Sequence, residues 1–206
     1  MQYTDVAWDF DGTLFDSYPR ILDAFQAALA DYGITEPDEH VLRHITVSIG
    51  QAAEYYRKTY QVEGDLFGSY QTHSADLRFD LVKPFAGSRE VLEHIVRSGR
   101  RNHLYTHRGE STYAYLDYYG FTRYFSEIIT AQNAFPSKPD PSALQYVIHT
   151  YSVGQLRLLM VGDRVIDLLA AKNAGQDACF YNSNHLDIPD CADYVIGEIS
   201  EVLKLL

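Results

Sequence analysis

Residues 6–17, VAWDFDGTLFDS, decide the fold of this chain and contain a candidate site. A short apolar run stops at two carboxylates, Asp9 and Asp11, that stand two residues apart. Because side chains alternate along a strand, both carboxylates can point the same way from its carboxyl end. Gly12 then permits a sharp turn and a close approach of backbone N–H groups to an anion. We interpret the pair as a nucleophile and a proton-transfer group, with a hard cation such as Mg²⁺ offsetting their repulsion from a phosphate.

Two other interpretations of this acidic turn stay open at this point. DxDG is also found in an ordinary turn after a strand, and it resembles half of a calcium loop. A calcium loop of the EF-hand type needs further oxygen ligands and a closing glutamate at about its twelfth position. After Gly12 the chain reads TLFDSYPR and becomes helical, so the calcium loop fits poorly. The phosphoryl-transfer hypothesis needs matching residues farther along the chain.

Length and composition favour one core domain with a modest insertion. The chain has 206 residues, which is long for a minimal domain and short for two full ones. Hydrophobic residues make up 46% and charged residues 22%, so the chain can bury a core. The 28 acidic and 17 basic residues give a net charge of -11, which disfavours a nucleic-acid or anionic-membrane surface. Any bound phosphate must be held locally.

The sequence shows no sign of secretion or membrane insertion. It lacks a basic start followed by a long apolar run, and no stretch reaches the ~20 apolar residues that span a bilayer. The two cysteines, Cys179 and Cys191, lack metal-ligand spacing. We therefore expect a soluble cytoplasmic protein without a disulfide framework.

Helical spacing dominates the segment between the first expected strand and Pro84. The first helix follows Pro19 and ends at Gly33, and its apolar residues recur at helical intervals. Further helices are expected over 38–45, 50–60 and 70–81, and no strand is expected there. We predict a helical insertion over 16–83 and a core made of 1–15 and 84–206.

After Pro84 the expected strands and helices alternate. Together with the first strand over 3–10, the expected strands are 102–106, 128–130, 156–161, 178–181 and 194–196. The expected helices are 88–98, 110–119, 141–151, 165–173 and one at the C-terminus. This alternation predicts an α/β fold, a Rossmann-like doubly wound parallel sheet with helices on both faces. Ligands in such sheets bind beyond the carboxyl ends of the strands.

Further polar residues occur where this rule expects a site. Thr106, in YTHRG, ends a strand beside a helix N-terminus, where a phosphate is favoured. Asp163, in GDRVID, also follows a strand, and Asp167 lies one turn later on the same helix face. Lys138, in SKPDP, precedes a proline-fixed helix start and can balance phosphate and carboxylate charge. Each alone can be a helix cap or a solvated side chain, but their joint occurrence makes coincidence a poor explanation.

The four motifs resemble those of the haloacid dehalogenase-like hydrolase superfamily. They read DFDGT, YTHR, the lysine of SKPDP, and GDRVID. The resemblance covers essentially the whole chain and is most specific for DxDGT combined with GDxxxD. It implies that the helical insertion is a cap, and the segment ITVSIGQAAEYY resembles the cap of phosphoglycolate phosphatase-like members.

The resemblance implies catalytic and phosphate-binding roles for matching residues. Asp9 would be the nucleophile, and Asp11 would protonate the leaving oxygen and later activate water. Thr106 and Lys138 would bind the phosphoryl group, and Lys138 would also restrain Asp9. Thr13, together with the backbone at Gly12, would form the phosphate loop.

The resemblance also implies a metal site. Asp9, Asp163 and the backbone carbonyl of Asp11 would hold Mg²⁺. Asp167 would bind the metal through water or orient its neighbours. The presence of an acid at Asp11 favours phosphate esters over carbon–halogen bonds, because a halide leaves without a proton.

One residue departs from the pattern of many relatives. His107 stands where they carry asparagine, although YTHR does occur among phosphoglycolate phosphatase-like sequences. A histidine can donate one hydrogen bond as asparagine does, and it titrates near neutral pH. We expect His107 to be a structural or phosphate-binding donor, with a role in substrate choice or pH response as the alternative.

The leading hypothesis is a Mg²⁺-dependent phosphatase that acts on a small phosphorylated metabolite, phosphoglycolate-like or a sugar phosphate. The alternatives are a phosphomutase of the same superfamily and a non-catalytic binding or regulatory protein on this fold. No nucleic-acid or membrane partner is expected, and the protein is expected to be a monomer or a homodimer. A closing cap leaves little room for a macromolecular substrate.

Overall fold

The computed structural model describes residues 3–154, 157–183 and 187–206, and the chain divides into two compact units. One unit, here called the core unit, comprises Met1–Phe15 and Pro84–Leu206. The other, the helical unit, comprises Asp16–Lys83. The chain therefore leaves the core unit shortly after its first strand and returns to it before its second.

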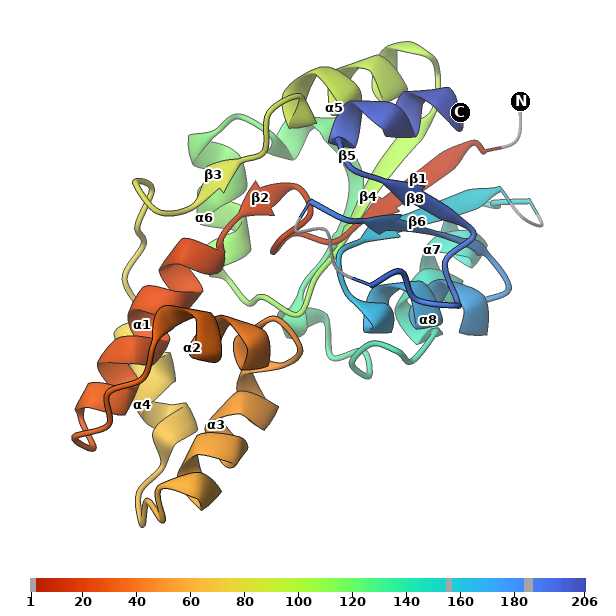
Figure 1. The fold of residues 1–206 in the computed structure, drawn as a ribbon. Coiled ribbons are helices and arrows are strands. Elements are labelled where there is room, and N and C mark those ends of the chain that lie inside the picture. Colours follow the sequence, from red (N-terminus) through yellow and green to blue (C-terminus); the bar gives the residue numbers. More distant parts are fainter. Residues whose placement is uncertain (1–2, 155–156, 184–186) are drawn as a thin grey trace. The chain divides into compact units, whose positions relative to one another are not determined.

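The core unit is built on a six-stranded sheet in the order β5-β4-β1-β6-β7-β8 (Figure 1). Every pairing in this sheet is parallel. Its strands are β1 (Asp5–Trp8), β4 (Arg101–Tyr105), β5 (Phe125–Ile129), β6 (Leu158–Gly162), β7 (Asp177–Tyr181) and β8 (Tyr194–Ile196). β1 lies at the centre, with β4 and β6 on either side.

The core unit alternates strands with helices, and the crossovers fix which face each helix covers. Its helices are α5 (Ser88–Arg97), α6 (Ser111–Tyr118), α7 (Ser142–Thr150) and α8 (Val165–Asn173). Short 3₁₀ turns are η1 (Thr122–Tyr124), η2 (Ala131–Asn133) and η3 (Ile199–Lys204). The chain runs from β1 through β4 to β5 in one direction across the sheet and then crosses back to β6 and β7 in the other direction. Because parallel crossovers are right-handed, α5 and α6 lie on one face of the sheet and α7 and α8 lie on the opposite face. The α/β doubly wound fold class is confirmed, and the strand order reverses direction beside β1, where such folds bind ligands.

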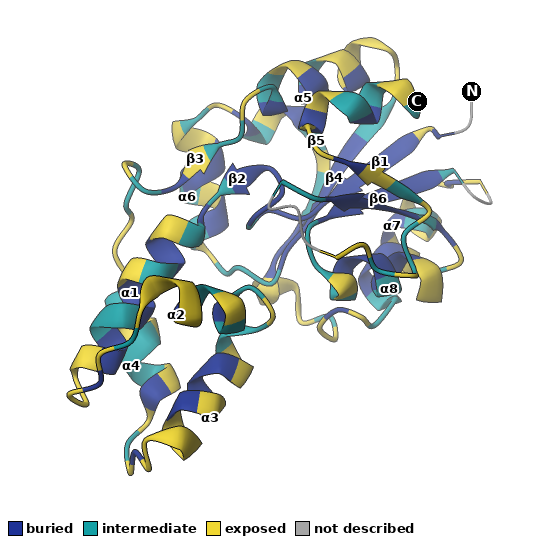
Figure 2. Cartoon of the chain, in the orientation of Figure 1, coloured by how far each residue is buried: buried dark blue, intermediate teal, exposed yellow. Residues whose placement is uncertain are grey.

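Strands covered on both faces explain why their sequences lack a polar alternation. All four residues of β1 and all five of β6 are buried. Figure 2 shows these strands in the buried colour, whereas the helices carry exposed residues on one side. Fully buried strands of this kind are typical of parallel sheets.

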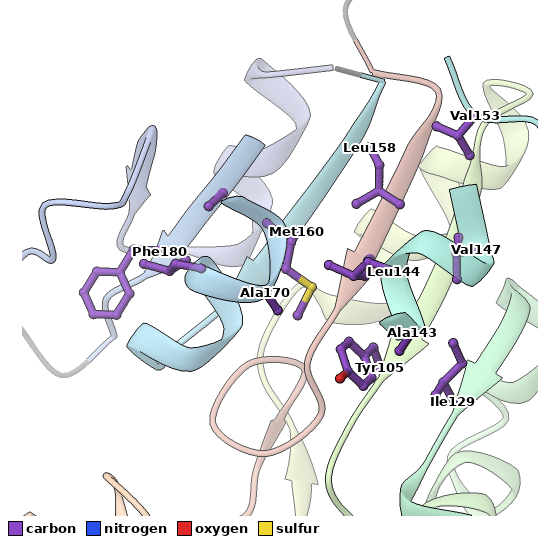
Figure 3. Packing of buried hydrophobic residues seen from close by; sticks show 14 residues of the cluster. Tyr105, Ile129, Ala143, Leu144, Val147, Val153, Leu158, Met160, Ala170 and Phe180 are labelled. Atoms are coloured by element: carbon purple, nitrogen blue, oxygen red, sulfur yellow. The ribbon is translucent and has the colours of Figure 1, made fainter. Parts of the chain in front are cut away.

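One face of the sheet packs against α7 and α8. Leu144 of α7, Ala170 of α8 and Met160 of β6 are all buried there, and Figure 3 shows their side chains among those of neighbouring strands. Tyr105 lies in the same cluster at the carboxyl end of β4. This packing fixes the strand ends from which the polar residues project.

Buried charges lie at the other end of β1. The Asp5 carboxylate accepts hydrogen bonds from Arg101 Nε at 2.6 Å and from His103 Nε2 at 2.8 Å. Burial acts to raise the pKa of Asp5, but the hydrogen bonds from His103, Arg101 and Thr4 outweigh it and lower the pKa to about 2. The ionised carboxylate is therefore part of the folded state.

Four helices make up the helical unit: α1 (Tyr18–Ala30), α2 (Asp38–Ile45), α3 (Ile49–Thr59) and α4 (Leu66–His73). They share a core of buried apolar residues that includes Phe25 and Tyr56, whose ring centroids are 5.8 Å apart. Across the part of the chain that the structure describes, no helix is long and apolar enough to cross a membrane.

Some expected elements differ from the structure. The helix expected over 70–81 instead spans Leu66–His73, because Asp65 caps it by accepting a hydrogen bond from the Gly68 N–H at 2.9 Å. Two-residue strands β2 (Phe15–Asp16) and β3 (Lys83–Pro84), which form a second sheet, were not expected. The C-terminal helix is the 3₁₀ helix η3, and the expected start of a strand at 156 lies outside the described residues.

Candidate active site

Three adjacent strands of the core unit end in polar residues. Asp9 follows β1, Thr106 follows β4 and Asp163 follows β6. β1 pairs in parallel with both neighbours, so that Trp8 lies opposite Leu104 on one side and Val161 on the other. The carboxyl ends of parallel strands meet at one edge of the sheet, and the polar residues meet there with them.

Asp9 is fully buried and is held by two cations. Lys138 Nζ lies 2.8 Å from Asp9 Oδ1, and Arg164 Nη2 lies 3.3 Å from Asp9 Oδ2. Lys138 Nζ also lies 2.7 Å from Asp167 Oδ1, and the side chains of the lysine and both acids have no exposed surface. Burial alone would lower the pKa of Lys138, but the carboxylates of Asp167 and Asp9 outweigh it and raise the pKa. The ammonium group therefore stays charged between the two acids.

Three carboxylates come together at this edge of the sheet. One oxygen from each of Asp9, Asp163 and Asp167 lies within 4.8 Å of the others. Carboxylate oxygens are the ligands that Mg²⁺ prefers, so the donor set fits this ion. The side chain of Asp11 is not part of this group, which leaves the backbone carbonyl as the expected contribution of that residue.

Asp167 contacts the protein through both of its carboxylate oxygens. Its Oδ1 contacts Lys138 Nζ, and its Oδ2 accepts a hydrogen bond from the backbone N–H of Arg164 at 3.0 Å. A Cβ added at Gly162 would stand 2.3 Å from the Asp167 Cβ, so only glycine permits this close approach. These contacts favour the orienting role for Asp167 over direct metal ligation.

The turn after β1 is closed by its own hydrogen bonds. Gly12 has a φ of 75°, and its backbone N–H donates to the Phe15 carbonyl at 2.9 Å. Thr13 Oγ1 donates to Asp163 Oδ1 at 3.2 Å, which joins this turn to the end of β6. Both residues of the expected phosphate loop thus lie at the site, each with a partner inside the protein.

Asp11 pairs with an arginine that the sequence analysis did not select. Arg108 Nη2 lies 2.6 Å from Asp11 Oδ1, and Arg108 Nε lies 3.2 Å from Asp11 Oδ2. The backbone N–H of Arg108 also donates to Thr106 Oγ1 at 3.1 Å. The candidate proton-transfer group and the candidate phosphate-binding hydroxyl are therefore both tied to Arg108.

His107 contacts the loop that carries Lys138. Its Nε2 accepts a hydrogen bond from the backbone N–H of Lys138 at 2.8 Å. Because an N–H group can only donate, Nε2 must be unprotonated, and the neutral ring carries its proton on Nδ1. Burial lowers the pKa of His107 to about 4, and the nearby charge of Lys138 acts in the same direction. A cavity of about 90 Å³ lies beside His107 and Thr106.

The structure thus brings together every residue that the sequence placed in the site. Two arginines were missed, Arg108 beside Asp11 and Arg164 beside Asp9. Both lie inside recognised motifs, YTHR and GDRVID, which was the signal available. The direction of such long side chains depends on packing that a sequence motif does not show.

The chain is similar to known proteins in sequence and in fold. Residues 6–180 match the model of the haloacid dehalogenase-like hydrolase family. The chain is 29% identical to a phosphoglycolate phosphatase of Vibrio parahaemolyticus, covering 98% of this chain and 95% of the relative. It is 30% identical to phosphoglycolate phosphatase 1 of Pseudomonas aeruginosa, covering 87% of this chain and 70% of the relative.

A solved structure shows the same fold. It is a hydrolase of subfamily IA of this superfamily from Geobacter sulfurreducens, 25% identical, with a TM-score of 0.77 over 99% of this chain and 96% of the other. The family match spans most of the chain and includes all four motifs of the site. The chain therefore belongs to the haloacid dehalogenase-like hydrolase family.

Proposed function

We propose that this protein is a Mg²⁺-dependent phosphatase that hydrolyses a small phosphate monoester through an aspartyl-phosphate intermediate on Asp9. The observation that carries the proposal is the position of Asp9, a buried carboxylate at the end of the central strand with Lys138 and Arg164 against its two oxygens. Burial raises the pKa of Asp9, and the positive charges of Lys138 and Arg164 act against that rise and attract a phosphate. Relatives named phosphoglycolate phosphatases support the same reaction.

In the first half-reaction an Asp9 oxygen attacks phosphorus, and the bond from phosphorus to the ester oxygen breaks. Asp11, protonated in the substrate complex, gives its proton to that leaving oxygen. In the second half-reaction water attacks phosphorus and gives a proton to Asp11, while the bond between phosphorus and Asp9 breaks. Inorganic phosphate is released, and both carboxyl groups return to their starting states.

The remaining residues bind and neutralise charge. Lys138 and Thr106 bind the phosphoryl oxygens, with Thr13 and the backbone at Gly12 closing the loop on the same side. His107 holds the Lys138 backbone through its contact with that N–H. The Thr106 hydroxyl and the Lys138 ammonium group are then available to the phosphoryl oxygens, where negative charge gathers in the transition state.

Asp9, Asp163 and the backbone carbonyl of Asp11 would hold Mg²⁺, with Asp167 orienting its neighbours. When bound, the ion supplies charge neutralisation between carboxylates and phosphate and polarises the phosphoryl oxygens. The three grouped carboxylates support this assignment.

We further propose that the helical unit acts as a cap that selects the substrate and excludes water. The substrate is then a small metabolite, phosphoglycolate-like or a sugar phosphate, and the protein works in the cytoplasm as a monomer or homodimer. Nucleic acids and membranes are not among its partners, in keeping with the net charge of -11.

The test measures inorganic phosphate release from a panel of small phosphate esters, with Mg²⁺ and with EDTA. Asp9→Asn should abolish release while leaving the thermal unfolding transition in place. Asp117→Asn, which changes an exposed acid on α6, is the matched control and should keep full activity. Substantial release by Asp9→Asn would remove Asp9 as the nucleophile. A phosphomutase would instead move phosphate between hydroxyls of a sugar phosphate without net release.

A further inference from the structure

Arg108 is held in a fixed orientation against Asp11. Its Nε and Nη2 atoms contact the Asp11 carboxylate at 2.6 to 3.2 Å, and its Nη1 lies 3.3 Å from Ser111 Oγ. The guanidinium also lies over the rings of Phe10 and Tyr115, 5.2 and 5.6 Å from their centroids. Stacking and hydrogen bonding of this kind hold the planar guanidinium so that the fork formed by its Nε and Nη2 atoms can bind a carboxylate.

The burial of Arg108 argues against a merely solvated ion pair. Its side chain is 15% exposed and that of Asp11 is 19% exposed, so both groups have lost most of their hydration. A surface pair contributes little and needs no such enclosure. An arginine placed in this way at the edge of a reaction centre is typical of carboxylate or phosphate recognition.

The contact conflicts with the work that Asp11 has to do under the proposed function. Asp11 must turn a carboxyl oxygen to the leaving group, yet both of its oxygens contact Arg108 in this structure. A second anion that takes over the fork would release Asp11 and keep the guanidinium paired. A carboxylate matches the fork in shape and charge, as Asp11 itself shows.

Charge on the leaving-group side points to the same occupant. An ester whose leaving group carries a carboxylate would bring that group close to Asp9 and Asp11, which repel it. A cation at this place offsets the repulsion, and Arg108 is positioned to do so through its contact with Asp11. A neutral leaving group would gain nothing from the guanidinium and would leave Asp11 held.

We propose that Arg108 determines substrate specificity by exchanging Asp11 for an anionic group on the leaving group, so that the enzyme selects phosphate monoesters whose leaving group carries a carboxylate. This inference rests on the proposed phosphatase function and assigns the choice between its two substrate classes to one residue, Arg108. Sugar phosphates with neutral leaving groups are then poor substrates.

The experiment compares two esters that differ in one group. 2-Phosphoglycolate carries a carboxylate, and 2-hydroxyethyl phosphate carries a hydroxymethyl group in its place. The ratio of their kcat/KM values is measured with Mg²⁺ for the wild type and for Arg108→Gln and Arg108→Lys. The control is Arg123→Gln, which removes another arginine that lies over an aromatic ring, 4.9 Å from the Tyr124 centroid, but does not contact an acid of the site.

A charge-assisted hydrogen bond predicts that the wild type prefers the carboxylate ester by roughly 10- to 100-fold. Arg108→Gln should bring the ratio close to one, mainly through a higher KM for phosphoglycolate. Arg108→Lys should give an intermediate ratio, because it keeps the charge but loses the fork. The control should keep the wild-type ratio. A general loss of catalysis cancels in this ratio, since it affects both esters.

The outcomes separate the role of Arg108 from the function on which it rests. Phosphate release from both esters at similar rates by the wild type, or an unchanged ratio in Arg108→Gln, would overturn the role of Arg108 and leave the phosphatase standing. If the wild type releases phosphate from none of the esters, both the role of Arg108 and the phosphatase function are overturned. If Arg108→Gln does not fold, the wild-type ratio and the Arg108→Lys variant still decide the question.

Discussion

Replacing Lys138 by methionine tests how strongly this site depends on one buried charge. The ammonium group lies 2.8 Å from Asp9 and 2.7 Å from Asp167, and all three side chains are fully buried. Methionine keeps most of the volume but leaves two carboxylates facing each other without their shared cation. Removing one partner of a buried ion pair costs roughly 3–5 kcal/mol of stability. We expect a loss of this size in the absence of divalent metal.

A second variant separates charge from packing. In Lys138→Met combined with Asp167→Asn, one of the two carboxylates is neutral, and the asparagine oxygen can still accept from the Arg164 N–H. Asp9 keeps its contact with the Arg164 guanidinium. The double variant should therefore be more stable than Lys138→Met alone, although it carries one more substitution.

The assay is urea unfolding in EDTA, followed by tryptophan fluorescence. Trp8, the single tryptophan of the chain, is buried in β1 next to Asp9, so its signal reports on the core unit. Lys172→Met is the matched control, because Lys172 pairs with Asp193 at 2.7 Å where both side chains are about one third exposed, 37% and 33%. Such a pair contributes at most about 1 kcal/mol. A loss in Lys138→Met no larger than in this control would refute the argument from burial.

Three further predictions concern other residues of the core unit. The pKa of Asp5 is lowered from its usual 3.8 to about 2 in the folded protein. The ionised carboxylate therefore contributes about 2 kcal/mol to the free energy of unfolding above pH 4, and this contribution is lost as the pH falls toward 2. Urea unfolding across this range should show that loss in the wild type and lack it in Asp5→Asn. Gly162→Ala places a Cβ 2.3 Å from the Asp167 Cβ and should lower the stability measured by thermal unfolding by about 1–3 kcal/mol. Gly197→Ala is the control, because its added Cβ meets nothing within 4 Å and should leave the stability unchanged. Equal effects of the two substitutions would contradict the close approach at Gly162. His107→Phe removes an acceptor for a backbone N–H and should lower kcat, whereas His107→Asn can restore the acceptor and should retain more activity; equal activities would show that the hydrogen bond is dispensable.

The sequence was sufficient for features that depend on short-range pattern. Asp9 and Asp163 could be located because each directly follows a run of buried residues that forms a strand. The helix over 38–45 was predicted with its correct bounds. The helix expected over 70–81 was misplaced, because a glycine, Gly68, lies inside α4. A two-residue strand such as β2 has no period to detect.

The contacts of long side chains could not be predicted in the same way. The Arg108 guanidinium reaches Asp11 because rings from two distant parts of the chain, at Phe10 and Tyr115, lie beneath it. Nothing in YTHR distinguishes that orientation from one in which the side chain extends into solvent. The sequence located the residue near the site, and tertiary packing determined its partner.

Pairing of charges within the site indicates how a substrate must enter it. The acids and cations in contact or grouped there are Asp9, Asp11, Asp163 and Asp167 with Lys138, Arg108 and Arg164. Four carboxylates and three cations leave one net negative charge, in a chain whose overall charge is also negative. A phosphate dianion therefore gains little by simply approaching this site. It can bind favourably only if a divalent cation supplies the missing charge and if cations already engaged with carboxylates exchange them for oxygens of the substrate. Lys138 and Arg164 make that exchange possible on the side of the nucleophile, and Arg108 makes it possible on the side of the leaving group.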